Sequence, residues 1–180
     1  IIKGMYCLKK NNNKKGPKIQ LLASGPMLNE AIKASNLLKS DWKINTTIWS
    51  VTSYSELHKE AENIERWNNL HPSHKKKISF INKNIKSNNG PVIAMSDYVK
   101  LVAEQISPYI NCPFLALGTD GFGRSGTRDS LRDFFEVNKY YITLSSINLL
   151  IKDKQIKNEI LPKAIKKYNI DVNKPNPNTI

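Results

Sequence analysis

The sequence predicts an α/β fold: a three-layer α/β/α domain built on a mostly parallel sheet of about five strands. Short apolar or β-branched runs alternate with stretches whose apolar residues recur at helical spacing, which is the order of a parallel sheet covered on both faces. Gly and Pro residues separate the two kinds of segment. A chain of 180 residues can build one sizeable core, whereas two full domains would be tight.

The first predicted unit is a strand, a helix and a second strand. Residues 1–17 are expected to form an entry segment and polar loop. A strand follows near 18–23, and Pro26 suits the first turn of a helix expected near 28–40. The alternating β-branched run near 46–51 is the second strand. A unit of this length allows the right-handed crossover that joins parallel strands.

The middle of the chain continues the alternation. A stripe of apolar residues at helical spacing predicts a helix near 57–70, and the apolar run near 92–96 is the third strand. Asp97 is expected to cap a helix near 97–108 through its carboxylate. A fourth strand is expected near 114–118.

The last third of the sequence is predicted to be helical. A helix is expected near 127–136. Residues 140–151 are ambiguous because they are β-branched and aromatic, but their spacing behind a cap at Asn138 favours a helix. The domain is therefore expected to cover residues 18–170, and residues 171–180 are expected to form a loose tail.

The composition narrows the classes of partner and compartment. The formal net charge is +13, but only four of the 28 basic residues are Arg, the residue that best recognises phosphates and bases. Abundant Lys, Asn and Ile are typical of an A+T-rich bacterial genome, so nucleic-acid binding is not expected. No apolar run approaches the ~20 residues that a membrane span needs. Cys7 and Cys112 form no disulfide framework and the chain lacks a secretory signal, which indicates a cytoplasmic protein.

The stretch 118–126 has the spacing of a dinucleotide-binding loop. Gly121, Gly123 and Gly126 form G-x-G-x-x-G between an apolar run and a helical stretch. The pattern follows the fourth apparent strand, however, whereas a dinucleotide fingerprint follows the first and is completed by an acid after the second. We therefore interpret it as a tight turn in which Gly121 and Gly123 supply backbone freedom. A stand-alone dinucleotide-binding module is the alternative.

The other reactive side chains lack companions. His71 and His74 could share a metal ion, but no third ligand is in view. Ser24, Ser53 and Ser125 stand in no nucleophile motif, and no Gly-Lys-Ser/Thr follows a glycine loop. The sequence therefore assigns no catalytic, cofactor-binding or metal-binding residue.

Six segments carry a resemblance to a known family. They are "KGMYCLKK" (3–10), "WSVTSYSEL" (49–57), "ERWNNLHP" (65–72), "SDYVKLVAEQI" (96–106), "LGTDGFGRSGTRDSLRDFFEV" (117–137) and "YNIDVNKPNP" (168–177). In this order, and over essentially the whole chain, they resemble the C-terminal part of the homodimeric bacterial pyruvate dehydrogenases. More distantly, the chain resembles the third domain of transketolases, where a similar D-x-F-G loop closes the last βα unit.

This resemblance implies a role within a larger enzyme. Members of the family decarboxylate pyruvate on thiamine diphosphate with Mg²⁺ and pass the acetyl group to the lipoyl arm of an acetyltransferase component. Their diphosphate motif is Gly-Asp-Gly followed by Asn-Asn, whereas this chain offers Thr119-Asp120-Gly121 and a single later Asn148. The resemblance therefore implies an assembly-supporting domain that is inactive and binds no cofactor alone. The partners it implies are the remaining domains of the same enzyme, a homodimer partner and the lipoyl acetyltransferase, without a membrane.

Two sets of residues are expected to be structural or to lie at an interface. In the first set, Asp120 is expected to accept backbone N–H groups within the turn or at the following helix. Phe122 is expected to bury apolar surface in the core or against a partner domain. That set comprises Asp120, Gly121, Phe122, Gly123, Arg124 and Ser125. The second set, from "ERWNNLHP", comprises Glu65, Arg66, Trp67, Asn68 and His71.

Overall fold

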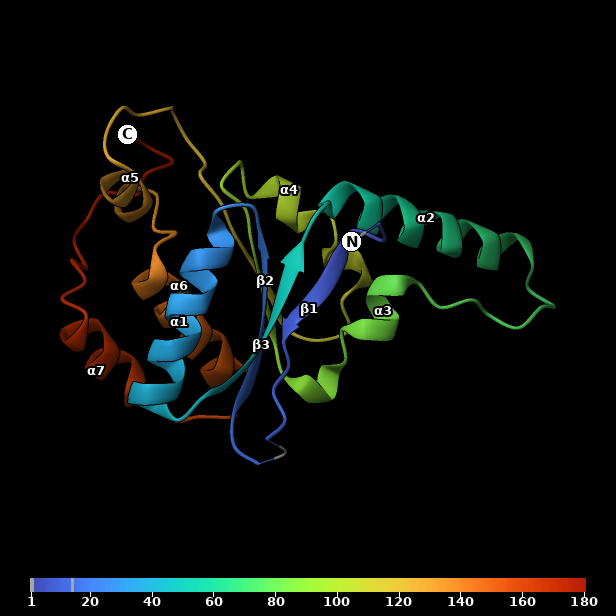
Figure 1. Ribbon diagram of the computed structural model, residues 1–180, viewed down its shortest axis with the longest axis horizontal. Coiled ribbons are helices and arrows are strands. Elements are labelled where there is room, and N and C mark those ends of the chain that lie inside the picture. Colours follow the sequence, from blue (N-terminus) through green and yellow to red (C-terminus); the bar gives the residue numbers. More distant parts are fainter. Residues whose placement is uncertain (1, 14) are drawn as a thin grey trace.

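The computed structural model describes residues 2–13 and 15–180 and contains one five-stranded sheet (Figure 1). The strands are β1 (Met5–Lys9), β2 (Lys18–Ser24), β3 (Asn45–Val51), β4 (Val92–Met95) and β5 (Phe114–Leu117). Their order across the sheet is β1-β3-β2-β4-β5. Strands β2 to β5 run parallel, and β1 pairs antiparallel with β3 at one edge. The predicted three-layer α/β/α class, with a mostly parallel sheet of about five strands, is confirmed.

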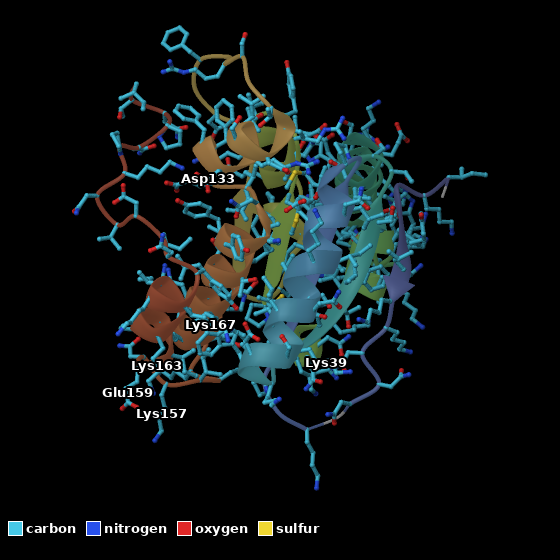
Figure 2. The ribbon with its side chains drawn as sticks, turned by 60° about the vertical axis from the view of Figure 1, so that its left-hand side comes forward. Lys39, Asp133, Lys157, Glu159, Lys163 and Lys167 are labelled. Carbon is cyan, nitrogen blue, oxygen red and sulfur yellow. The ribbon has the colours of Figure 1, made fainter. Side chains whose placement is uncertain are left out.

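One face of the sheet is covered by the first and the last helices of the chain. Helix α1 (Met27–Trp42) packs beside α6 (Lys139–Lys152), which in turn contacts α7 (Ile160–Lys167). Helix α5 (Arg128–Phe134) lies at the end of this layer (Figures 1 and 2). The buried core on this side is built from Ile19, Leu21, Ala23, Met27, Ala31, Ala34, Leu38, Ile44, Ile93, Met95, Val137, Ile142, Ile147, Leu149, Leu150 and Ala164.

The opposite face is covered by helices from the middle of the chain. They are α2 (Tyr54–Leu70), α3 (Phe80–Asn84) and α4 (Leu101–Glu104), with two short 3₁₀ turns at 87–89 and 107–109. Their core holds Met5, Leu22, Trp49, Val51, Tyr54, Leu57, Ala61, Ile81, Ile85, Val92, Ala94, Ala103, Ile106 and Ala116. Neighbouring residues of β2 and β4 therefore enter different cores, which explains why these strands read as continuous apolar runs.

The N-terminal strand β1 was not anticipated, because residues 1–17 were expected to be an entry segment and polar loop. Only Met5 of this strand is buried, and its next four residues are exposed. An edge strand with one buried residue shows no alternation of apolar and polar side chains, so the pattern has little to reveal it. The remaining strands lie within about two residues of their predicted positions.

The predicted helix at 97–108 is wrong, because the segment forms only α4 and a 3₁₀ turn at 107–109. Its first residues bond to the neighbouring loop instead of to a helix: Thr119 donates its backbone N–H to the carbonyl of Tyr98 at 2.9 Å. The predicted cap at Asp97 is also wrong, because α4 begins after Lys100. The helical interpretation of 140–151 is confirmed by α6, where Asn138 accepts N–H groups from Tyr140 and Tyr141.

The tail, residues 171–180, has neither helix nor strand, but it lies against the body of the domain instead of being loose. Lys174 places its ammonium 3.6 Å from the carboxylate of Asp133 and 5.1 Å from the ring centroid of Tyr141. Pro177 is buried. These contacts are made with distant parts of the chain, and composition alone carries no sign of them.

A buried hydroxyl between β2 and β4 gives a first prediction about the stability of the domain. The hydroxyl of Tyr54 lies 3.0 Å from the carbonyl of Leu22 and 3.1 Å from both the carbonyl and the N–H of Met95. Tyr54→Phe leaves the buried N–H of Met95 without this acceptor and should lower the free energy of unfolding by about 1–3 kcal/mol. Urea unfolding measures it, with the exposed Tyr98→Phe as a control expected to change stability by less than ~0.5 kcal/mol. Equal effects of the two changes would contradict the assignment.

A buried carboxylate makes the stability of the α1 layer depend on pH. Glu30, whose side chain is 4% exposed, binds Arg132 at 3.1 Å and accepts the backbone N–H of Lys139 at 2.9 Å. Burial by itself raises the pKa of Glu30, but hydrogen bonds from Lys33 and Lys139 and the charge of Arg132 outweigh burial and lower the pKa. Because this pKa is depressed in the folded state, the stabilisation is present above the ordinary Glu pKa and is lost as the pH falls through the folded value.

Glu30→Gln should therefore flatten the dependence of stability on pH. Urea midpoints measured from pH 7 to pH 3 should fall less steeply for Glu30→Gln than for the wild type, and the two should converge at the acidic end. The exposed Glu159 supplies a matched control, since Glu159→Gln should keep the wild-type slope. A Glu30→Gln variant with the wild-type slope would show that this carboxylate does not govern the acid limb.

Candidate functional site

Two loops meet at the carboxyl ends of β4 and β5, and together they hold most of the sequence-predicted candidates. They are residues 96–100 and residues 118–127, which we call the carboxyl-edge loops. Ser96 donates its backbone N–H to the carbonyl of Leu117 at 3.0 Å. The hydroxyl of Thr119 donates to the carbonyl of Asp97 at 3.0 Å. These bonds continue the pairing of the two strands beyond the sheet.

The carboxylate of Asp120 joins the two loops. Its Oδ1 accepts the backbone N–H of Lys100 at 2.8 Å, and its Oδ2 lies 3.7 Å from the ammonium of Lys100. Asp120 therefore satisfies an N–H group at the start of α4, where a negative charge also meets the positive end of the helix. The acceptor role expected of Asp120 exists, but its partner lies at the helix before β5 and not at the helix after it.

Of the three glycines in the G-x-G-x-x-G spacing, only Gly121 sits where a side chain cannot. Its φ of +100° is left-handed, and a Cβ there would lie 2.6 Å from the carbonyl oxygen of Pro177. The interpretation that Gly123 supplies backbone freedom is wrong, because its φ is ordinary and a Cβ there would meet nothing within 4 Å. Sequence reasoning missed Gly118, where a Cβ would lie 2.3 Å from the backbone nitrogen of Lys100.

The carboxyl-edge loops present large apolar side chains to solvent. Phe122 is 80% exposed and Tyr98 67%, and Leu101, at the start of the adjoining α4, is 68% exposed. Phe122 is thus outside the core, which leaves a partner as the remaining expectation for its apolar surface. Arg124 places its guanidinium 5.1 Å from the ring centroid of Phe134, and Ser125 is exposed in the same loop. Loops that gather exposed apolar groups in this way are suited to contact another surface.

The second candidate set forms the far end of α2. The ring of Trp67 stacks on that of His71 with centroids 4.4 Å apart, and the ammonium of Lys77 lies 3.7 Å above the Trp67 ring. Asn68 holds the backbone of Lys77 with two bonds, accepting its N–H at 2.8 Å and donating to its carbonyl at 3.0 Å. Glu65 and Arg66 are exposed beside this cluster. The motif therefore folds back on itself and gives the end of the helix a fixed shape.

The structure does not bring the two candidate sets together. Figure 1 shows α2 leading away from the sheet toward one end of the long axis, while α5 and the C-terminus lie toward the other end. A single active site built from both sets is therefore excluded, and each set forms a separate surface.

The family of the chain follows from comparison with known proteins. The family model described as the transketolase-like C-terminal domain matches residues 4–138. The chain belongs to this family. The match covers the sheet, α5 and both candidate sets, so the carboxyl-edge loops and the end of α2 are parts of the transketolase-like domain itself.

Similar curated proteins confirm the resemblance that the sequence motifs carry. A protein named pyruvate dehydrogenase E1 component from Cupriavidus necator is 46% identical over 181 residues, covering 100% of this chain and 20% of the relative. A protein of the same name from Buchnera aphidicola of Acyrthosiphon pisum is 48% identical and covers 98% of this chain and 20% of the relative. The chain thus spans about a fifth of the length of these relatives.

Similar solved structures show the same fold. A transketolase structure from Pichia stipitis has a TM-score of 0.56 at 17% identity and covers 85% of this chain and 19% of that one. Transketolase from Campylobacter jejuni has a TM-score of 0.52 at 16% identity, covering 81% of this chain and 18% of that one. At these identities the likeness concerns the fold of the transketolase-like domain alone.

The reactive side chains of the transketolase-like domain form neither a metal site nor a nucleophile site among the described residues. The rings of His71 and His74 meet edge to face at 5.5 Å, and among the described residues no three His, Cys, Asp or Glu side chains converge on a metal position. The hydroxyl of Ser53 caps α2 by accepting the N–H of Glu56. Burial raises the pKa of both thiols, that of Cys112 to about 11, so neither is a ready nucleophile at neutral pH. No helix in the described part of the chain is long and apolar enough to cross a membrane.

The different demands at two glycines of the same loop can be measured. Gly121→Ala forces a side chain into a left-handed conformation and against the carbonyl of Pro177, and should cost about 1–3 kcal/mol of stability. Gly123→Ala meets open space at an ordinary φ and should be neutral or slightly stabilising. Urea unfolding of the two variants compares them directly. Equal losses of stability in the two variants would contradict the close contact between Gly121 and the carbonyl of Pro177.

Proposed function

We propose that this chain is the C-terminal, assembly-supporting domain of a pyruvate dehydrogenase E1 component. The whole enzyme would use thiamine diphosphate and Mg²⁺ to decarboxylate pyruvate, and would transfer the acetyl group to the lipoyl group of an acetyltransferase component. The observation that carries the proposal is the alignment of the entire chain, at 46% identity, with one fifth of a protein of that name. A shared sequence over that whole length supports a shared place within the larger enzyme.

The residues of this chain do not fit the cofactor, which supports a structural role for it. Mg²⁺ on a diphosphate takes oxygen ligands such as an acid and an amide held close together. Asp120 is already engaged by the N–H and the ammonium of Lys100. Asn148, the later amide, is exposed on α6. We therefore assign thiamine diphosphate, its metal and the catalytic groups to the remaining domains, and derive no chemical step from this chain.

The surfaces described above supply the contacts that such a role needs. We assign Phe122, Arg124 and Ser125, on the carboxyl-edge loops, to contacts with the remaining domains or with the homodimer partner. Arg124 is suited to an acidic group there because its guanidinium can bind a carboxylate with two hydrogen bonds. The far end of α2 adds Leu70 and Ile78, both exposed, beside the fixed Trp67 cluster. We expect the assembled enzyme in the cytoplasm.

The geometry gives no support to the alternative of a stand-alone dinucleotide-binding module. Such a loop needs glycines so that its backbone can approach a pyrophosphate. Here the first glycine of the spacing, Gly121, is packed against the carbonyl of Pro177, so the turn is covered by the chain's own tail. The first turn of α5 is occupied by its own cap, since Thr127 accepts the N–H of Ser130 at 3.2 Å. Packing within the domain accounts for Gly121, and neither packing nor φ requires glycine at position 123.

The proposal predicts that the isolated chain neither binds thiamine diphosphate nor decarboxylates pyruvate. Calorimetric titration of the chain with thiamine diphosphate and Mg²⁺ together should show no saturable heat, because no described group of ligands converges on a metal. Saturable binding would contradict the assignment of the cofactor to the other domains.

A chimaeric enzyme tests whether the chain supports activity when it is joined to the remaining domains. The chain should replace the matching fifth of the Cupriavidus necator relative, and pyruvate decarboxylation by the chimaera should be compared with that of the relative lacking this part. We expect the chimaera to be active and the truncated relative to be inactive. A soluble chimaera without activity would contradict the proposed function even if the isolated chain binds no cofactor.

A further inference from the structure

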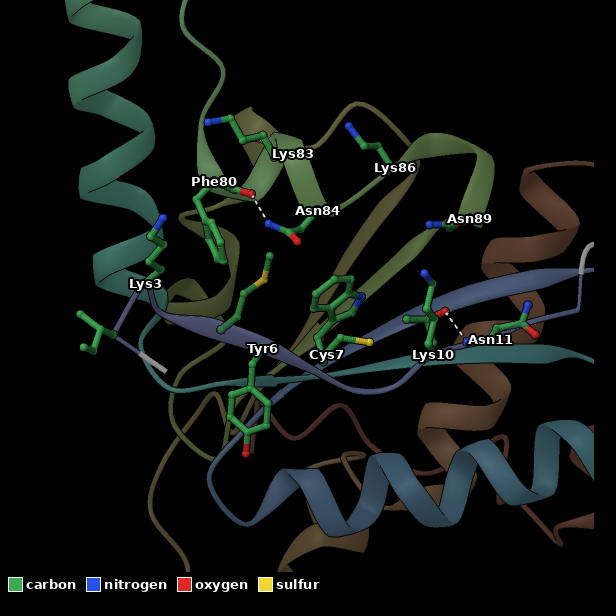
Figure 3. A pocket seen from close by; sticks show the side chains of 14 residues that line it. Lys3, Tyr6, Cys7, Lys10, Asn11, Phe80, Lys83, Asn84, Lys86 and Asn89 are labelled. Carbon is green, nitrogen blue, oxygen red and sulfur yellow. Dashed lines mark hydrogen bonds between the residues drawn. The ribbon is translucent and has the colours of Figure 1, made fainter.

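A large cavity in the described part of the chain lies away from both candidate sets and has no role in the proposed function. It has a volume of about 840 Å³ and opens where α3 stops short of the β1 edge of the sheet (Figure 3). Met5 and Trp49, both buried, contribute to its floor from β1 and β3. Phe80 of α3 forms an apolar wall. Its volume is within the range of ordinary ligand sites, and its floor and one wall are apolar.

The cavity is surrounded by positive charge. Lys3, Lys10, Lys83 and Lys86 are among its fourteen lining residues, and none of the fourteen is acidic. Within residues 2–13 and 15–180, none of these four ammonium groups forms an ion pair. Figure 3 shows Lys3 and Lys83 near Phe80, with Lys10 toward the other end, beside Asn11. Negative charge on an occupant of this cavity would therefore meet complementary charge.

The nearest carboxylates do not neutralise this site. Glu56 and Glu60 line a smaller neighbouring pocket that shares Lys3, Phe80 and Lys83 with the large one. Glu60 accepts the backbone N–H of Phe80 at 2.9 Å, and Glu56 lies 3.5 Å from Lys59. Both acids thus have other partners, and they stand beside one end of the cavity only.

The indole of Trp49 carries an unsatisfied donor. Trp49 as a whole is 7% exposed, and its Nε1–H is buried without a hydrogen-bond acceptor in the described chain. A buried donor without a partner costs about 1–3 kcal/mol. Because this N–H is itself buried, Trp49 contributes apolar surface to the cavity and not a hydrogen-bond donor.

The cavity continues along an open strand edge. β1 pairs with β3 on one side only, so within the described residues its other backbone edge has no strand beside it. Residues Tyr6, Cys7, Lys10 and Asn11 extend the cavity lining along and beyond this strand. Figure 3 shows Tyr6 directed to the opposite side of β1 from Phe80 and Asn84, so both faces of an added strand would find a neighbour. An exposed edge of this kind accepts an extended segment through main-chain hydrogen bonds.

We propose that β1 and the lysine-lined cavity bind an extended acidic peptide segment of a partner protein. The segment pairs with the free edge of β1, places one apolar side chain over Met5 and Trp49, and directs its carboxylates to Lys3, Lys10, Lys83 and Lys86. The open edge favours a peptide over a small anion, because a small anion would need the lysines but no strand. This inference does not rest on the proposed enzyme, since it concerns a surface that the cofactor chemistry leaves unused.

The test uses a synthetic acidic peptide with a single apolar residue, acetyl-Asp-Glu-Asp-Glu-Phe-Glu-Asp-Glu-amide, so that the Phe and the Asp side chains lie on the same face of the added strand. Its dissociation constant for the chain is measured by calorimetry, and hydrogen exchange of the amides of residues 5–9 is followed in parallel. We expect saturable binding below ~1 mM and slower exchange in β1. A second peptide carries N-methyl groups at alternate residues, which remove main-chain donors and leave the charges unchanged. It should bind at least about tenfold more weakly.

Matched charge variants separate a site from general attraction. Lys10→Glu with Lys83→Glu should weaken the peptide at least about tenfold, because both ammonium groups line the cavity. Lys157→Glu with Lys163→Glu makes the same change in net charge at the α7 side of the molecule (Figure 2), and should leave affinity nearly unchanged. Circular dichroism and urea unfolding check that both variants are folded.

Several outcomes would overturn the proposal. They are no saturable binding, equal binding of the N-methylated peptide, and equal weakening by the two double variants. A fourth is displacement of the peptide by inorganic pyrophosphate without any protection of β1, which would identify an anion site that uses only the lysines. The Lys residues and the bulge between Cys7 and Lys9 would then serve to protect the edge from pairing.

Discussion

The arrangement of the domain depends on one hydroxyl group at the centre of its sheet. The chain places β3 on one side of β2 and then crosses to place β4 on the other side. The hydroxyl of Tyr54, at the first turn of α2, spans the two strands by contacting Leu22 and Met95. Because β4 continues directly into residues 96–100, the position of the carboxyl-edge loops is fixed by this contact. The hydroxyl is buried, so its loss would leave buried polar groups of both strands without this partner.

The parts of the fold that could be predicted are those whose signal lies within the element itself. Strands β2 and β4 are buried on both faces and therefore appear as short apolar runs, and the cap at Asn138 marks the start of α6. Strand β1 shows no such apolar pattern, because four of its five side chains are exposed. It is held in the sheet by backbone pairing with β3, which the sequence pattern does not reveal. The segment after Asp97 has the composition of a helix, but the carbonyl of Tyr98 is taken by Thr119. Tertiary hydrogen bonds outweighed local propensity there.

The candidate surfaces also differ in how far they could be predicted from the sequence. The cluster around Trp67 is local, because His71 and Lys77 reach its ring from nearby positions in the chain, and a short motif can therefore represent it. The carboxyl-edge loops owe their shape to residues far away in sequence. The need for glycine at position 121 comes from Pro177 as well as from its own left-handed φ, and the acceptor role of Asp120 serves a helix that precedes it. The lysine-lined cavity could not be predicted from the sequence for a further reason. Part of its lining belongs to β1, and the sequence pattern did not predict that strand.

The contact between the tail and the glycine loop has a consequence for the order in which the domain is completed during synthesis. The five strands and their helices are made before residues 174–178, and a chain emerging from the ribosome can begin to fold from its N-terminal side. Until that segment arrives, Gly121 has no carbonyl above it and Asp133 has no Lys174 beside it. The carboxyl-edge loops thus reach their final shape later than the sheet that supports them. A nascent chain would present a finished scaffold before it presents a finished surface for its partners.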